Sequence, residues 1–84
     1  MLVFLNRGKG ARVIRTKEVQ IVVNGQLRQV PEGQSLLQLL ALLEVDPARV
    51  AIELNGSIVR RELWIETPIA GGAALEIVQF VGGG

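Results

Sequence analysis

The sequence predicts an α+β fold in which one main helix packs across a mixed sheet of four to five strands. Two asparagine–glycine pairs, at 24–25 and 55–56, follow apolar segments, and this pair is the strongest short signal of a β-hairpin. Between the two pairs lies one leucine-rich segment with helical spacing. A further apolar segment closes the chain, so strands are expected on both sides of a single helix.

Length and composition limit the functions that the chain can perform. Its 84 residues make one small domain without cysteine or histidine. That composition excludes disulfides, cysteine-rich metal sites and a nucleophile activated by imidazole. No apolar run has the length of a membrane span. We therefore expect a cytoplasmic protein that contacts no membrane, binds no metal or cofactor and has no catalytic apparatus of its own.

Charge divides the chain at residue 18. Five of its nine basic residues lie in residues 1–18, which we expect to form a flexible basic extension, with an edge strand over Leu2–Leu5 as the alternative. Residues 19–84 hold four arginines and seven acidic residues, which leaves this part about three charges negative. An acidic body with few aromatic residues predicts no nucleic-acid partner.

The first hairpin and the helix follow in order. Residues 19–23 form the first strand of the domain, and the polar segment 26–30 returns as an outer strand. Ser35 and Gln38 have the spacing of a capping box that starts a helix. Leu36, Leu39, Leu40 and Leu43 then line one helical face as core. The helix is expected to end near Val45, before a single turn capped by Asp46-Pro47.

The remaining segments complete the sheet. We expect strands at 50–54, 58–59 and 75–80, a helical turn at 60–64 and a tight turn at 70–73. Leu63 and Trp64 are interpreted as closing the core. The apolar character of 75–80 predicts a central strand that is buried on both faces. This element order is that of the ubiquitin-like β-grasp, in which the first and last strands lie side by side.

The chain ends on Gly82, Gly83 and Gly84, directly after the last apolar strand. A frayed terminus is the simplest interpretation of such a tail. However, a segment without Cβ atoms can enter a slot too narrow for other residues, and its terminal carbonyl is open to attack from either face. We therefore interpret Gly84 as the functional residue.

From residue 19 to 84 the chain resembles the ThiS family, the sulfur carrier proteins of thiamine biosynthesis. The matching segments are 22–25, 32–40, 51–56, 58–64 and 75–84. The terminal glycines are the most specific of these, and the order and spacing of all five strengthen the match. Residues 1–18 depart from the family pattern, which usually begins at the first strand.

The resemblance implies a carrier that is acted on by other enzymes. An adenylyltransferase of the ubiquitin-activating type would use ATP to adenylate Gly84. Sulfur from a cysteine desulfurase relay would convert it to a thiocarboxylate, which thiazole synthase would consume. Gly82, Gly83 and Val81 would form the threading tail, and Phe80 with nearby apolar residues would dock on the partner enzymes.

Three alternatives remain open on the sequence. The small subunit of molybdopterin synthase shares the fold and the tail, although it usually has a longer segment between the helix and the third strand. A ubiquitin-like modifier attached to lysines would use the same tail chemistry. The third alternative is a plain interaction domain with an inert tail.

Overall fold

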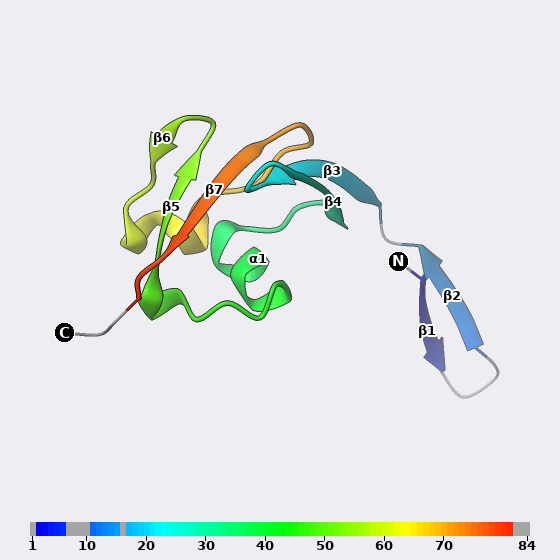
Figure 1. Ribbon diagram of the computed structural model, residues 1–84. Coiled ribbons are helices and arrows are strands. Elements are labelled where there is room, and N and C mark those ends of the chain that lie inside the picture. Colours follow the sequence, from blue (N-terminus) through cyan, green and yellow to red (C-terminus); the bar gives the residue numbers. More distant parts are fainter. Residues whose placement is uncertain (1, 7–10, 16, 82–84) are drawn as a thin grey trace.

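One helix packs against one face of a five-stranded mixed sheet (Figure 1). The computed structural model describes residues 2–6, 11–15 and 17–81. The sheet has the order β4-β3-β7-β5-β6, in which β3 and β7 are parallel and the other neighbours are antiparallel. Its strands are β3 (Glu18–Val23), β4 (Gln26–Pro31), β5 (Val50–Leu54), β6 (Ser57–Ile58) and β7 (Ala74–Gln79). The predicted β-grasp arrangement, with the first and last strands of the domain adjacent, is confirmed.

Both predicted asparagine–glycine turns are present. Asn24 and Gly25 have φ angles of 50° and 80°, and Asn55 and Gly56 have φ angles of 51° and 87°. Two consecutive positive φ angles are the signature of a type I′ turn, whose twist matches that of the flanking strands. These turns set the register of the β3–β4 and β5–β6 pairs.

Helix α1 (Leu36–Leu42) begins at the predicted capping box. The Gln38 main-chain N–H donates to Ser35 Oγ at 3.2 Å, and the Ser35 N–H donates to Gln38 Oε1 at 2.9 Å. The helix ends three residues earlier than predicted, because Glu44 adopts a left-handed φ of 59°. The N–H groups of Glu44 and Val45 then donate to the carbonyls of Ala41 and Leu40, which satisfies the last turn of the helix.

The core lies between α1 and the sheet. Its buried members include Leu36, Leu39 and Leu40 of the helix, Ile21 and Val23 of β3, Val50 and Ile52 of β5, and Leu75 of β7. Two short 3-10 helices, Pro47–Arg49 and Arg61–Glu66, connect the strands, the first of them capped by Asp46 as predicted.

Trp64 closes the core as predicted, but Leu63 does not. The indole of Trp64 is buried and its Nε1–H donates to the Val59 carbonyl at 2.9 Å. The Arg61 guanidinium lies 4.9 Å from the centroid of the indole ring and also donates to the Val50 carbonyl at 3.3 Å. Leu63 remains 41% exposed, because the 3-10 helix turns only one of these adjacent side chains inward.

The prediction that the last strand is buried on both faces is wrong. Along β7, Leu75 is buried and Ile77 is half-buried, whereas Glu76 and Val78 are exposed. The physical reason is that a single helix covers one face of a sheet, and no described element covers the other face. Alternate residues of the central strand therefore face solvent.

Residues 2–6 and 11–15 form a separate two-stranded sheet. Strand β1 (Leu2–Asn6) pairs antiparallel with β2 (Ala11–Arg15), and Figure 1 shows the two strands apart from the main sheet. The alternative in which Leu2–Leu5 adds an edge strand to the main sheet is therefore wrong for the described residues. The expected flexibility of this extension stays a prediction.

The core assignment predicts that alanine substitutions at two leucines of α1 lower the free energy of unfolding by different amounts. Leu40→Ala should lower the free energy of unfolding by about 2–5 kcal/mol, because Leu40 is fully buried and its removal leaves a cavity. Leu42→Ala is the matched control, since Leu42 is 47% exposed and should cost less than ~1 kcal/mol. Urea unfolding of both variants measures the difference. Equal losses would contradict the assignment of this helical face to the core.

Candidate functional site: the C-terminal tail and the open face of the sheet

The chain leaves the sheet at the end of β7. The Phe80 N–H donates to the Arg49 carbonyl at 2.7 Å, which continues the β5–β7 pairing one residue beyond the strand. After that bond, Val81 is 91% exposed. The described chain therefore leaves the sheet at a fixed point, directly after Phe80. Gly82, Gly83 and Gly84 lie outside the described residues.

The side chain of Asn24 extends β3 alongside β7. The Ile77 N–H donates to Asn24 Oδ1 at 2.7 Å, and Asn24 Nδ2 donates to the Ile77 carbonyl at 3.2 Å. The amide thus supplies the donor and acceptor that a further strand residue would supply. Sequence reasoning assigned Asn24 only to a turn. Its positioning role was missed, because its partner lies 53 residues away in the chain.

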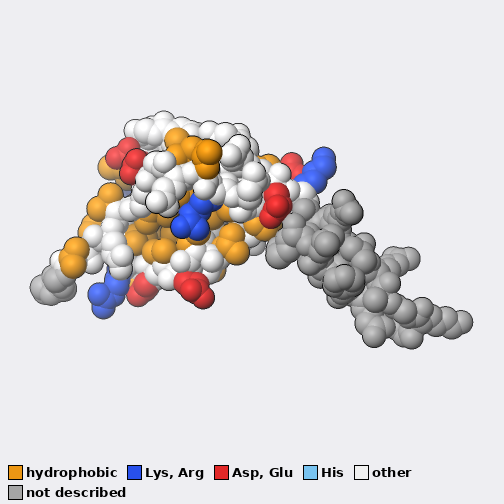
Figure 2. Space-filling view, turned by 45° about the vertical axis from the view of Figure 1, so that its right-hand side comes forward, with side chains coloured by type: hydrophobic (Ala, Val, Ile, Leu, Met, Phe, Trp, Pro, Cys, Tyr) orange, Lys and Arg blue, Asp and Glu red, His pale blue; other side chains and the backbone are white. Residues whose placement is uncertain are grey.

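The uncovered face of the sheet, which we call the open face, carries exposed apolar side chains. Ile58, Val78 and Phe80 are 76%, 55% and 55% exposed, and Leu27 is 68% exposed. The strand register places Leu27 opposite Val22, and Val78 opposite Ala51, on this face. Figure 2 shows that hydrophobic side chains are also exposed elsewhere on the described domain. Exposed apolar residues gathered on one face of a domain are typical of a protein-docking surface.

Two carboxylates interrupt this apolar surface. Glu53 and Glu76 are directly opposite each other in the β5–β7 register. Like charges in cross-strand positions are destabilising, so this pair does not stabilise the folded state. The described ion pairs lie elsewhere: Arg49–Asp46 at 3.7 Å and Arg60–Glu62 at 3.1 Å, both solvent-exposed. Exposed pairs of this kind contribute little to stability.

The described residues limit the chemistry that the domain itself can perform. Among residues 17–81, no group of three acidic side chains gathers in an arrangement that holds a metal ion. Within the same part of the chain, every helix is too short or too polar to cross a bilayer. Of the predicted site residues, Phe80 and Val81 lie where the described chain leaves the open face.

Comparison with known proteins gives consistent matches. The model of the ThiS family matches residues 18–84. The sulfur carrier protein ThiS of Escherichia coli K12 is 33% identical over 66 residues, which are 79% of this chain and all of that protein. The crystal structure of thiamine biosynthesis protein ThiS from Geobacter metallireducens has a TM-score of 0.70 and 35% identity, and covers 79% of this chain and all of that one.

A longer protein also matches. The thiazole synthase of Paramagnetospirillum magneticum is 36% identical over 66 residues. That stretch is 79% of this chain but only 20% of the synthase. The chain therefore spans about one fifth of that relative.

The two turn asparagines allow a matched test of the Asn24 bridge. Asn24→Gly removes both hydrogen bonds to Ile77, whereas Asn55→Gly removes the one bond that Asn55 Oδ1 accepts from the Ala74 N–H. Glycine tolerates the positive φ at either position. Asn24→Gly should therefore cost about 1 kcal/mol more in unfolding free energy than Asn55→Gly. Amide exchange at Ile77 should accelerate only in the first variant, and unchanged exchange there would contradict the bridge.

Proposed function

The chain belongs to the ThiS family of sulfur carrier proteins, and we propose that Gly84 carries the sulfur for the thiazole ring of thiamine as a C-terminal thiocarboxylate. One observation supports this most directly: β7 is anchored on both sides, and two residues after its end comes the exposed Val81, which is followed by three glycines. A rigid support next to a side-chain-free tail suits a substrate that must enter another protein's active site.

The chemistry proceeds on the terminal carboxylate. An adenylyltransferase of the ubiquitin-activating type joins Gly84 to the α-phosphate of ATP and releases pyrophosphate. The terminal sulfur of a persulfide, supplied by a cysteine desulfurase relay, then attacks the acyl carbon, and AMP leaves. A second thiol cleaves the resulting S–S bond, which yields the thiocarboxylate and a disulfide on the sulfur donor. In this scheme ATP belongs to the activating enzyme, and the carrier binds no cofactor of its own.

The chain itself supplies reach and orientation. Four residues, 81–84, extend to at most about 13–14 Å, which is enough to place Gly84 inside a buried site while the domain stays outside. Gly82 and Gly83 have no Cβ atoms that would widen the tail. Phe80 and the apolar residues of the open face dock the domain against the partner.

Thiazole synthase is the proposed acceptor of the sulfur. A protein of that name contains a stretch 36% identical to this domain, which supports an association between carrier and synthase. The family match and the thiamine-related relatives favour this role over molybdopterin synthesis and over attachment to lysines. Those two alternatives would use the same tail and differ in the enzyme that receives it.

Tail length provides the first test. Deleting Gly84 should abolish adenylation and sulfur loading while the melting temperature stays unchanged. The shortened chain still ends in a glycine carboxylate, but that group is about 3.5 Å short of the ATP phosphates. A misplacement of about 1 Å already costs such reactions roughly 100-fold. Gly83→Val should be nearly as damaging, because its side chain obstructs the tail. Near-normal loading of the shortened chain would refute the proposed function.

The docking role of the open face has a separate test. Val78→Arg should weaken productive binding of the adenylyltransferase by roughly tenfold or more, because a charge would be buried at the contact. Leu42→Arg is the matched control, since Leu42 has similar exposure but lies on the helix. The KM for the carrier in pyrophosphate exchange measures both effects. Equal KM values for the two variants would show that the open face is not part of the docking site.

A further inference from the structure

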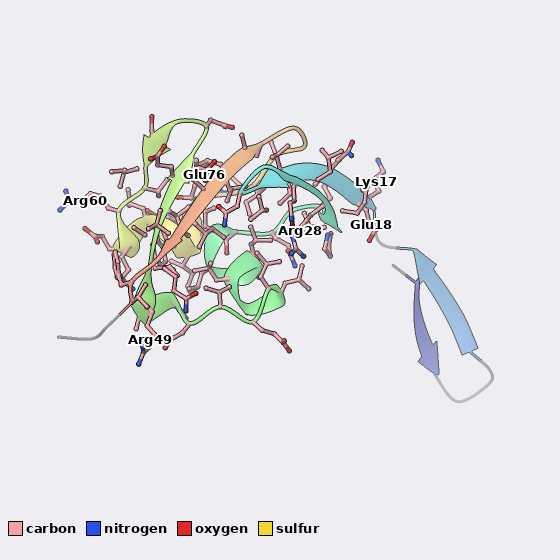
Figure 3. The ribbon with its side chains drawn as sticks, viewed as in Figure 1. Lys17, Glu18, Arg28, Arg49, Arg60 and Glu76 are labelled. Atoms are coloured by element: carbon pink, nitrogen blue, oxygen red, sulfur yellow. The ribbon has the colours of Figure 1, made fainter. Side chains whose placement is uncertain are left out.

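The main-chain carbonyl of Arg49 holds the chain at the point where the tail begins. It accepts the Phe80 N–H at 2.7 Å, one residue beyond the end of β7. Figure 3 shows Arg49 at the end of the domain where β7 ends, with its side chain extending outward. That side chain pairs with Asp46 at 3.7 Å. The carbonyl rather than the side chain therefore holds Phe80, and its position decides where residues 81–84 begin.

Hydrogen bonds within the segment fix the shape of the turn that carries this carbonyl. Asp46 Oδ1 accepts the Ala48 N–H at 2.9 Å, and the Asp46 carbonyl accepts the Arg49 N–H at 3.1 Å. Both bonds join residues that are close neighbours in the chain, so they do not fix the turn relative to the rest of the domain. A contact with a more distant segment is required for that.

Arg61 provides this contact from the 3-10 helix Arg61–Glu66. Its Nη1 donates to the Pro47 carbonyl, and its Nη2 donates to the Val50 carbonyl at 3.3 Å. These two carbonyls lie on either side of Arg49 in the chain. Because the guanidinium is planar and presents its donors in a rigid fork, it fixes the two carbonyls relative to each other. One side chain thus holds the segment around Arg49 from both ends.

The bond to Val50 takes the place of a strand partner. Strand β6 and the residue after it follow β5 as far as Ile52, whose carbonyl accepts the Val59 N–H at 3.0 Å. The Val50 carbonyl lies two residues nearer the start of β5, points to the same side and accepts from Arg61. The other side of β5 pairs with β7. The start of β5 is therefore bonded on both sides, to the strand that leads into the tail and to Arg61.

Trp64 connects Arg61 with the core. The guanidinium carbon lies 4.9 Å from the centroid of the indole ring, within the range of a cation–π interaction. The ring is itself fixed, because it is buried and its Nε1–H donates to the Val59 carbonyl. A continuous set of contacts therefore runs from the core through Trp64 and Arg61 to the segment whose carbonyl holds Phe80.

We propose that Arg61 is a positioning residue of the sulfur carrier, which keeps the Arg49 carbonyl in place so that the tail begins at Phe80 and no earlier. This proposal rests on the proposed function, since it concerns the delivery of Gly84 to the adenylyltransferase. Without the fork the hydrogen bond of Phe80 opens more easily, and at least one further residue must be ordered together with residues 81–84 inside the partner. The conformational cost of ordering that residue lowers productive placement of the carboxylate roughly tenfold.

Arg61→Lys tests the structural step on the carrier alone. Lysine keeps the charge, but its ammonium has no planar fork that fits both carbonyls. The ¹⁵N order parameter of the Phe80 amide should fall from about 0.85, typical of rigid backbone, toward the flexible range below ~0.6. Arg60→Lys is the matched control, because its described partner is the exposed Glu62, and it should leave the order parameter unchanged. An unchanged order parameter in Arg61→Lys would overturn this proposal and leave the proposed function intact.

Pyrophosphate exchange with the adenylyltransferase tests the functional step. The kcat/KM of Arg61→Lys should be roughly tenfold below that of the wild-type chain. Val30→Ala controls for stability, because it removes buried atoms from β4, at the sheet edge opposite β6. Assayed equally far below its own melting temperature, it should keep the wild-type kcat/KM.

The possible outcomes separate the two proposals. A wild-type kcat/KM in Arg61→Lys, or equal losses in Arg61→Lys and Val30→Ala, would overturn the positioning role while the wild-type chain is still adenylated. A wild-type chain that is not adenylated would refute the proposed function and this proposal with it.

Discussion

The pairing of β7 on both of its sides is the constraint on which the rest of the structure depends. Residues 75–79 pair with β5, and the start of β7 pairs in parallel with the end of β3. Beyond the end of β3, the side-chain amide of Asn24 forms the two hydrogen bonds to the main chain of Ile77 that a further β3 residue would form. The strand that carries the tail is therefore held at the centre of the sheet. The direction in which the tail leaves is set by hydrogen bonds rather than by the tail itself.

The single helix explains why one face of the sheet carries exposed apolar side chains. Helix α1 has seven residues, and its three buried leucines cover one face of the sheet. Within residues 17–81, no helix or strand covers the other face of the sheet. The apolar residues on that face, such as Ile58 and Val78, are exposed, as is typical of surfaces that contact a partner.

Local signals in the sequence predicted most of the fold, and long-range contacts account for what was missed. The asparagine–glycine turns and the capping box are determined within a few residues, so they could be recognised directly. Glu44 ended the helix early by adopting a positive φ that few non-glycine residues accept, which no pattern indicated. The exposed face of β7 and the bridge from Asn24 depend on what lies across the sheet. The hydrogen bonds from Arg61 to Pro47 and Val50 likewise form only when distant segments pack together.

Intact-mass analysis of the protein recovered from thiamine-starved cells tests the central claim most directly. Starvation raises demand for the thiazole precursor, so a carrier in that pathway should accumulate in its loaded form. The account predicts a population heavier by the replacement of one oxygen by sulfur, and fragmentation should place that replacement at Gly84. A protein that carries only its unmodified carboxylate under these conditions, with the activating enzyme present and active, would contradict it.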